Sequence, residues 1–152
     1  MLGDFFTNLN VPFKIHVDAA YGGFIYPFTN PMSRFTFQNP YMNSITADGH
    51  KMLQTPYGTG LFLIRKGFFD YVKTEEAQYI PGKDYTVSGS RSGANAISMW
   101  MILQIHGSEG WKYKMETLCD HTERICKRLE RMGVGYFRNQ YLNIIAIKAK
   151  YI

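Results

Sequence analysis

A short run of β-branched and aromatic residues that ends at an acid is the segment that most constrains the fold. Residues 13–18 (FKIHVD) form the run, and the small-residue segment 19–23 (AAYGG) follows it directly. This pattern is typical of a buried strand that ends in a loop. Because a strand that stops at an acid and then at glycines often ends at a site, Asp18 is a candidate functional residue.

Four further strands are predicted, in two pairs. Residues 43–48 (NSITAD) and 59–65 (TGLFLIR) form the first pair, and the turn-prone residues 56–58 between them suit a hairpin-like return. Residues 134–138 and 142–149 form the second pair, with a turn at Asn139 and Gln140. The second pair suggests the start of a small α+β unit.

Two helices are predicted between these pairs of strands. Gly107 is placed to end the first helix, over residues 94–106, and Gly133 ends the second, over residues 109–132. Apolar residues recur at helical spacing on both helices: Ala96, Ile97, Trp100, Met101 and Leu103 on the first, and Trp111, Met115, Leu118, Cys119, Ile125 and Leu129 on the second. Cys119 and Cys126 lie two turns apart, too far for a disulfide within a regular helix, so we expect buried thiols in a reducing compartment.

The charge and hydropathy patterns argue against two classes of partner. The formal net charge is +5, but the 17 lysines and arginines are scattered along the chain, which disfavours a nucleic-acid role. Charged or polar residues interrupt every hydrophobic run before it reaches the roughly 20 residues of a membrane span. The first residues (MLGDFF) place no basic region ahead of an apolar segment, so we expect no signal peptide and a cytoplasmic protein.

Lys51 follows the second predicted strand and is a candidate nucleophile. A lysine amine held at a strand end and partly desolvated can react with a carbonyl carbon, although a lysine after a strand is usually just solvent-exposed. A pyridine cofactor works as an electron sink only while its nitrogen is protonated, which requires a carboxylate beside that nitrogen. Asp18 supplies such a carboxylate, and Ala19 and Ala20 beyond it leave room for a flat ring. The alternative for Asp18 is a carboxylate that caps a turn.

Three segments together resemble a known family. Residues 16–23 (HVDAAYGG), 44–52 (SITADGHKM) and 88–93 (SGSRSG) resemble, in order and spacing, the group II pyridoxal-5'-phosphate (PLP)-dependent decarboxylases. That group includes aromatic-amino-acid, glutamate, tyrosine and histidine decarboxylases, with sphingosine-phosphate lyase as a relative. The chain is only about a third of the usual family length, and in the family a cofactor-stacking histidine and a phosphate loop lie upstream of the D-A-A segment. We therefore expect a partial chain.

The resemblance implies a fold and a set of domains. The fold expected is α/β: part of the large domain of a PLP-dependent transferase-like (fold type I) protein, with a mixed β-sheet, plus the start of the small α+β C-terminal domain. Residues 1–107 would form the partial large domain and residues 108–152 the start of the small one. PLP is the implied cofactor, an amino acid the implied substrate and a homodimer the implied assembly. No metal site is expected.

The resemblance also implies roles for individual residues. Lys51 would bind the cofactor covalently, Asp18 would pair with the pyridinium nitrogen, and Ala20 would pack on one face of the ring. His50 would contact the phosphate, the alternative being an ordinary half-buried histidine. Ser90 matches a position that in some members reaches the phosphate of the neighbouring subunit.

Other residues keep open roles. Arg91 either anchors its loop, meets a substrate carboxylate or forms a structural ion pair. Asp48 is expected to orient a neighbouring donor, because a carboxylate close to a phosphate would repel it. Tyr79 and Tyr85 are candidate proton donors, since some relatives carry a mobile tyrosine in this connection.

The function implied is decarboxylation of an amino acid, by a carboxy-lyase of which this chain carries the cofactor-binding lysine. A carbon–carbon lyase of the sphingosine-phosphate type is the first alternative, because the same motifs are compatible with it. A non-catalytic remnant is the second. The identity of the substrate is left open by the sequence.

Overall fold

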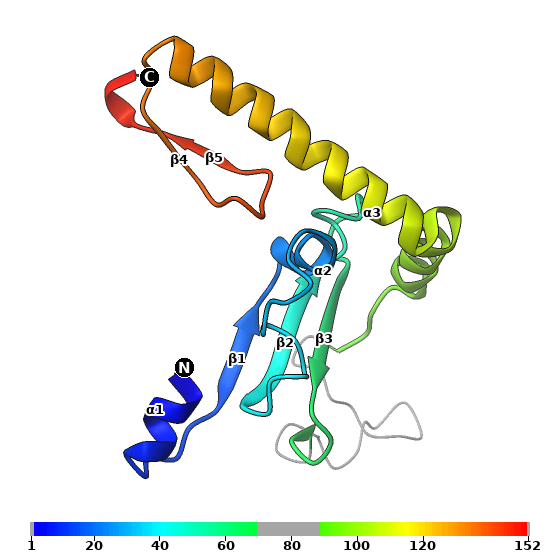
Figure 1. Ribbon diagram of the computed structural model, residues 1–152. Helices are drawn as coiled ribbons and strands as arrows, with labels where there is room; N and C mark the ends of the chain where they lie inside the picture. Colours follow the sequence, from blue (N-terminus) through cyan, green and yellow to red (C-terminus); the bar gives the residue numbers. More distant parts are fainter. Residues whose placement is uncertain (1, 70–88, 152) are drawn as a thin grey trace.

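The computed structural model describes residues 2–69 and 89–151 of the 152-residue chain. Its elements run along the chain as shown in Figure 1. They are, in order, α1 (Leu2–Asn8), β1 (Ile15–Asp18), the 3-10 turn η1 (Gly22–Phe24), α2 (Tyr26–Thr29), β2 (Met42–Asp48), β3 (Gly60–Ile64), α3 (Gly93–Arg131), β4 (Tyr136–Arg138), β5 (Ile145–Ile147) and the 3-10 turn η3 (Ala149–Tyr151). Among the described residues, no helix has the length and hydropathy that a membrane span requires.

The first sheet is mixed and has the order β1-β2-β3. Strand β1 pairs parallel to β2, with Asp18 opposite Thr46, and β2 pairs antiparallel to β3, with Asp48 opposite Gly60. The predicted strands and the hairpin-like return are confirmed. Because β1 and β2 run in the same direction, the residues that follow Asp18 and Asp48 leave the sheet at the same edge.

Two apolar clusters hold the chain together. Ala19, Met42 and Ile45 are buried on the sheet, with Val17, Phe35 and Phe37 packed against them. The second cluster joins the loops at the sheet edge to α3, and its buried members are Ile25, Leu53, Met99, Trp111 and Met115. The second cluster therefore ties the end of each parallel strand to the long helix.

The long helix α3 is two helices joined at Gly107, as the sequence predicts. Gly107 has φ 57° and ψ −176°, which is not helical and is adopted readily only by glycine. Gly133 follows the helix with φ 67°. Both glycines thus end a helical segment where the sequence analysis placed them.

Replacing Gly107 with alanine should lower the free energy of unfolding by about 1–3 kcal/mol, because alanine is strained at this φ and ψ. Nothing lies within 4 Å of the Cβ that alanine would add, so the effect reports the backbone alone. The matched control is Gly93→Ala at the start of α3, where the added Cβ also meets open space and φ is not positive. Urea denaturation of both variants checks this, and equal midpoints would contradict it.

The apolar stripe predicted on the second half of α3 is partly wrong. Trp111 and Met115 are buried as expected, but Ile125 is 53% exposed, and Thr122 and Cys126 are buried instead. The buried positions 111, 115, 122 and 126 follow one another after four, seven and four residues, so they lie on one face, and Ile125 lies beside that face. Cys119, which is half-buried, and Cys126 are both free thiols.

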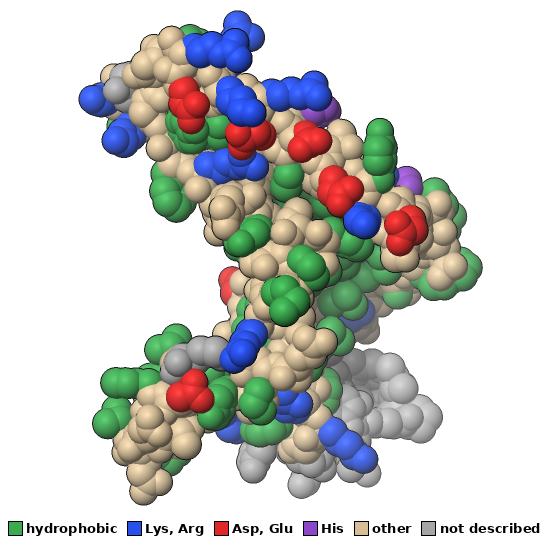
Figure 2. Space-filling model, viewed as in Figure 1, with side chains coloured by type: hydrophobic (Ala, Val, Ile, Leu, Met, Phe, Trp, Pro, Cys, Tyr) green, Lys and Arg blue, Asp and Glu red, His purple; other side chains and the backbone are tan. Residues whose placement is uncertain are grey.

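The first half of α3 and the strand β3 expose much of their apolar surface. Ile97 and Trp100 are 60% and 62% exposed, and Phe62 on β3 is 50% exposed. On this half of the helix Met99 is buried, so the apolar spacing of the sequence marks a surface that the described residues largely leave open. By contrast, Figure 2 shows acidic and basic side chains interspersed along the second half of α3.

The hairpin of β4 and β5 lies beside the second half of α3 (Figure 1) and pairs antiparallel. Both strands are shorter than predicted, and Leu142 N donates to Asn139 O in the segment that connects them. This connection packs on the residues that follow β1: Tyr21 Oη donates to Asn143 Oδ1 at 3.0 Å, and Thr29 Oγ1 donates to Tyr141 O at 2.9 Å. The predicted boundary between residues 107 and 108 stays a prediction.

Candidate active site

Asp18 and Lys51 leave neighbouring strands at the same edge of the sheet. Ala19 N donates to Thr46 O at 2.9 Å and Asp48 N donates to Ala20 O at 3.1 Å, so the two chain segments stay paired beyond the strands. Gly49 then passes through a tight space, because a Cβ there would lie 2.7 Å from Thr55 Oγ1. These contacts fix where the Lys51 backbone emerges.

A cavity of about 600 Å³ brings the predicted residues together. Asp18, Ala20 and Lys51 line it, and the other lining residues are Val17, Ala19, Tyr21, Gly22, Tyr26, Ser33, Phe35 and Leu142. Asp18 and Lys51 thus line one cavity from the ends of two neighbouring strands, together with two small alanines. Their roles toward a cofactor stay predictions.

The Asp18 carboxylate also caps a turn. Its Oδ1 accepts a hydrogen bond from Ala20 N at 3.0 Å, which fixes the direction of the side chain. The turn cap that the sequence left as an alternative is therefore present. It is compatible with the predicted role, because a carboxylate has a second oxygen that can accept another hydrogen bond.

Asp48 contacts the lysine. Its Oδ2 lies 3.0 Å from Lys51 Nζ and 3.8 Å from His50 Nε2. Asp48 is thus the carboxylate in contact with the Lys51 amine, and its role in orienting that amine stays a prediction.

His50 does not line the cavity. Its Nδ1 lies 2.8 Å from Thr59 O, and its ring lies 5.2 Å from the ring of Tyr57. The contact of His50 with a phosphate stays a prediction.

Residues 89–93, the described part of the third segment, do not line this cavity. Ser90 is exposed just before α3, and its contact with a neighbouring subunit stays a prediction. Arg91 lines a different cavity, which Asp48 also lines. Tyr79 and Tyr85 lie outside the described residues.

The sequence analysis missed part of the cavity wall. Leu142, in the connection between β4 and β5, lines the cavity together with Tyr26 and Phe35. Asn139 Nδ2 donates to Tyr26 Oη at 3.1 Å and helps to hold this connection in place. Asn139 and Gln140 marked a turn in the sequence, but nothing local in the sequence shows where that turn packs.

Comparison with known proteins identifies the family. Residues 2–137 match the pyridoxal-dependent decarboxylase conserved domain. The chain belongs to the pyridoxal-dependent decarboxylase family. Members of this family use pyridoxal phosphate, so the cofactor that the sequence implied is that of the family.

Decarboxylases with different substrates are similar to this pyridoxal-dependent decarboxylase chain. A tryptophan decarboxylase from Clostridium sporogenes is 45% identical over 152 residues, covering 100% of this chain and 36% of the relative. A histidine decarboxylase from Vibrio campbellii is 34% identical over 133 residues, covering 88% of this chain and 34% of the relative. The chain thus spans about a third of the length of the curated relatives that it matches.

Solved structures show the same fold for this chain. A glutamate decarboxylase from Lactobacillus brevis superposes with a TM-score of 0.82 at 24% identity, covering 95% of this chain and 34% of that one. A sphingosine-1-phosphate lyase from Burkholderia pseudomallei superposes with a TM-score of 0.65 at 25% identity, covering 78% and 28%. The mixed sheet and helices are therefore part of a PLP-dependent fold type I domain, as predicted.

Proposed function

We propose that this chain forms one wall of the active site of a pyridoxal-phosphate-dependent amino-acid decarboxylase. The observation that carries the proposal is the cavity of about 600 Å³ that Asp18 and Lys51 line together. Its volume falls in the range of roughly 300–1,000 Å³ that is usual for ligand sites. A carboxylate, an amine and small side chains at one cavity fit a flat, electron-poor pyridine ring that carries an aldehyde.

Each residue has a distinct part in this proposal. When bound, pyridoxal phosphate supplies a ring that accepts the electrons released when a carboxylate leaves as carbon dioxide. Lys51 would hold the aldehyde end through its amine and give it up to the amine of the substrate. Asp18 would keep a proton at the ring nitrogen, and Ala20 would leave space along the ring. Asp48 orients the Lys51 amine, which it contacts at 3.0 Å.

An amino acid is the proposed substrate, and a cytoplasmic homodimer is the proposed form of the complete enzyme. The 45% identity to the C. sporogenes tryptophan decarboxylase over the whole chain supports an amino-acid substrate. Ser90 supports the homodimer, since it matches a position that reaches the neighbouring subunit in some family members. His50 and Ser90 are the proposed contacts to the cofactor phosphate.

The carbon–carbon lyase is the second candidate. It is favoured by the likeness to the B. pseudomallei sphingosine-1-phosphate lyase, with a TM-score of 0.65 over 78% of this chain. Decarboxylation is preferred because the relatives with the higher identity carry that activity in their names.

The products distinguish the candidates. The purified protein with pyridoxal phosphate is incubated separately with L-tryptophan, L-histidine, L-tyrosine and sphingosine 1-phosphate, and the products are analysed by mass spectrometry. A decarboxylase gives equal amounts of amine and carbon dioxide from at least one amino acid. An aldehyde with phosphoethanolamine indicates the lyase. A non-catalytic remnant is indicated if borohydride fixes no cofactor to Lys51 at saturating pyridoxal phosphate.

Replacing Asp48 with asparagine should lower the turnover number about fivefold, because a partly exposed ion pair contributes about 1 kcal/mol. The amount of cofactor that borohydride fixes to the protein should not change, since Lys51 is retained. Lys127→Gln is the matched control: it removes an exposed ion pair with Glu123 on α3, away from both Asp48 and Lys51, and turnover should stay the same. A loss of bound cofactor in Asp48→Asn would contradict a purely orienting role.

A further inference from the structure

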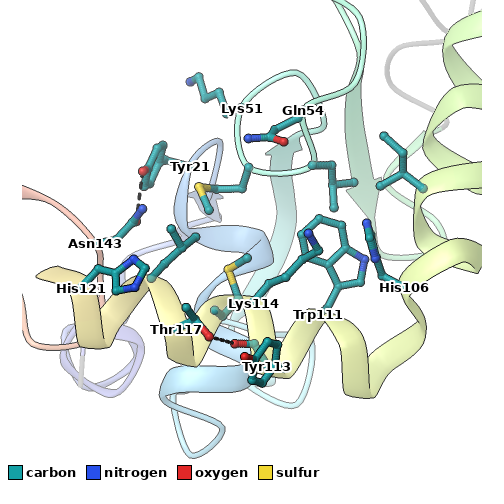
Figure 3. A pocket seen from close by; sticks show the side chains of 15 residues that line it. Tyr21, Lys51, Gln54, His106, Trp111, Tyr113, Lys114, Thr117, His121 and Asn143 are labelled. Atoms are coloured by element: carbon teal, nitrogen blue, oxygen red, sulfur yellow. Dashed lines mark hydrogen bonds between the residues drawn. The ribbon is translucent and has the colours of Figure 1, made fainter.

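A second cavity, of about 680 Å³, is also lined by Lys51. It opens between the loop of residues 51–54 and the part of α3 that follows Gly107 (Figure 3). Lys51 and Tyr21 line both cavities, but the remaining residues that line this one do not line the first. The second cavity is thus a separate space next to the candidate active site.

The inner wall of this cavity is apolar and partly aromatic. Three buried members of the second apolar cluster line it: Leu53, Trp111 and Met115. Further apolar surface comes from Met52, Ile102 and Leu118. His106 packs its ring edge-on to Trp111, with ring centroids 5.3 Å apart. A wall of this kind suits a small planar apolar group.

The polar side chains around this wall are neutral or basic. Lys51, His106, Lys114 and His121 line the cavity, and no aspartate or glutamate is among the described residues that line it. Asp48 already contacts Lys51, whereas no ion pair joins Lys114 to any described residue. Lys114 is therefore the cation available to a ligand, and the absence of carboxylates from this wall disfavours a ligand that carries its own ammonium group.

Trp111 places an indole in the wall of this cavity. Trp111 is 6% exposed and lines the cavity, and its Nε1 has no hydrogen-bond partner among the described residues. An indole N–H can only donate, and buried donors are usually paired. The nitrogen itself is buried, so Trp111 serves here as an apolar surface and as a reporter of ligand binding.

We propose that this second cavity binds a small aromatic carboxylate that lacks an amino group. Its ring would lie on the wall formed by Leu53, Trp111 and Met115, and its carboxylate would meet the Lys114 ammonium. Such a ligand differs in charge from the amino-acid substrate of the neighbouring cavity. The inference does not depend on the proposed decarboxylation, because Lys114 and Trp111 do not line the cavity of Asp18.

Phenylacetate is the probe, and the two tryptophans make the test specific. In a ¹H–¹⁵N spectrum each tryptophan gives one indole N–H signal. The Trp100→Phe variant assigns these signals, because the one that remains belongs to Trp111. Phenylacetate should shift the Trp111 signal saturably and leave the signal of Trp100, which is 62% exposed and lines another cavity. Phenylacetamide and phenethylamine, which carry the same ring without a negative charge, should bind at least about threefold more weakly.

Variants of two neighbouring lysines decide whether the charge acts as proposed. Lys114→Gln should weaken phenylacetate about threefold to tenfold, because it removes a charge-assisted contact. Lys112→Gln, an exposed lysine on the same helix that does not line the cavity, should leave the affinity unchanged. Both positions are exposed, so neither variant should disturb folding. No shift at Trp111, equal binding of phenylacetamide, or equal effects of the two lysine variants would each overturn the proposal.

Discussion

Replacing Lys51 with alanine should abolish the covalent retention of pyridoxal phosphate and lower the rate of decarboxylation by about 10³–10⁴-fold. The amine lies at the cavity that Asp18 also lines, and it is the proposed covalent attachment point. Alanine has no group that could replace it. Borohydride reduction followed by peptide mapping measures the attachment, and carbon dioxide release measures the rate.

The structure provides a control for this loss. Lys66, which follows β3, is exposed like Lys51 but lines neither the cavity of Asp18 nor the second cavity. Lys66→Ala should therefore keep both the bound cofactor and the rate. The Lys51 side chain is 40% exposed and its ion pair with Asp48 is worth at most about 1 kcal/mol, so Lys51→Ala should fold normally. Cofactor still fixed to another lysine in that variant would refute the assignment.

The position of Asp18 and Lys51 at one edge of the sheet could be predicted because each residue ends or follows a strand that is visible in the sequence. Parallel pairing then brings the two strand ends to the same edge, and Asp18 lies opposite Thr46 on β2. Leu142 could not be placed in the same way. Its position at the cavity depends on how the β4–β5 connection packs against Tyr26, a contact between residues far apart in the chain.

The residues at which helices end were predicted more accurately than the residues that become buried on the helices. Gly107 interrupts α3 because its φ of 57° suits glycine, and this preference is a local property of the residue. Which apolar residues become buried depends on the surfaces that pack against the helix. Ile125 and Trp100 have apolar side chains at helical spacing, yet they are 53% and 62% exposed because the described elements do not cover them.

Replacing Arg65 with methionine should lower the free energy of unfolding by about 2–4 kcal/mol. No sequence pattern revealed the role of this residue. Its guanidinium follows β3 and donates to three backbone carbonyls: Nε to Met42 O at 2.6 Å, and Nη2 to Phe37 O and to Asn39 O, both at 2.8 Å. The guanidinium carbon also lies 5.4 Å from the centroid of the Phe37 ring. Methionine would leave these half-buried carbonyls without their charged donor.

Two further variants show whether the fork of the guanidinium, rather than its charge, stabilises this region. Arg65→Lys keeps the charge, but one ammonium cannot reproduce the planar arrangement of donors, so at least half of the loss should remain. Lys66→Met makes the same change from cation to methionine at the next, exposed position, and its effect should stay within about 0.5 kcal/mol. Urea denaturation measures all three free energies of unfolding, provided that their dependence on urea concentration has the same slope. If Arg65→Met and Lys66→Met unfold at the same urea concentration, the hydrogen bonds of Arg65 do not hold residues 37–42 against the sheet. Other contacts must then fix the part of the cavity wall that Phe35 contributes.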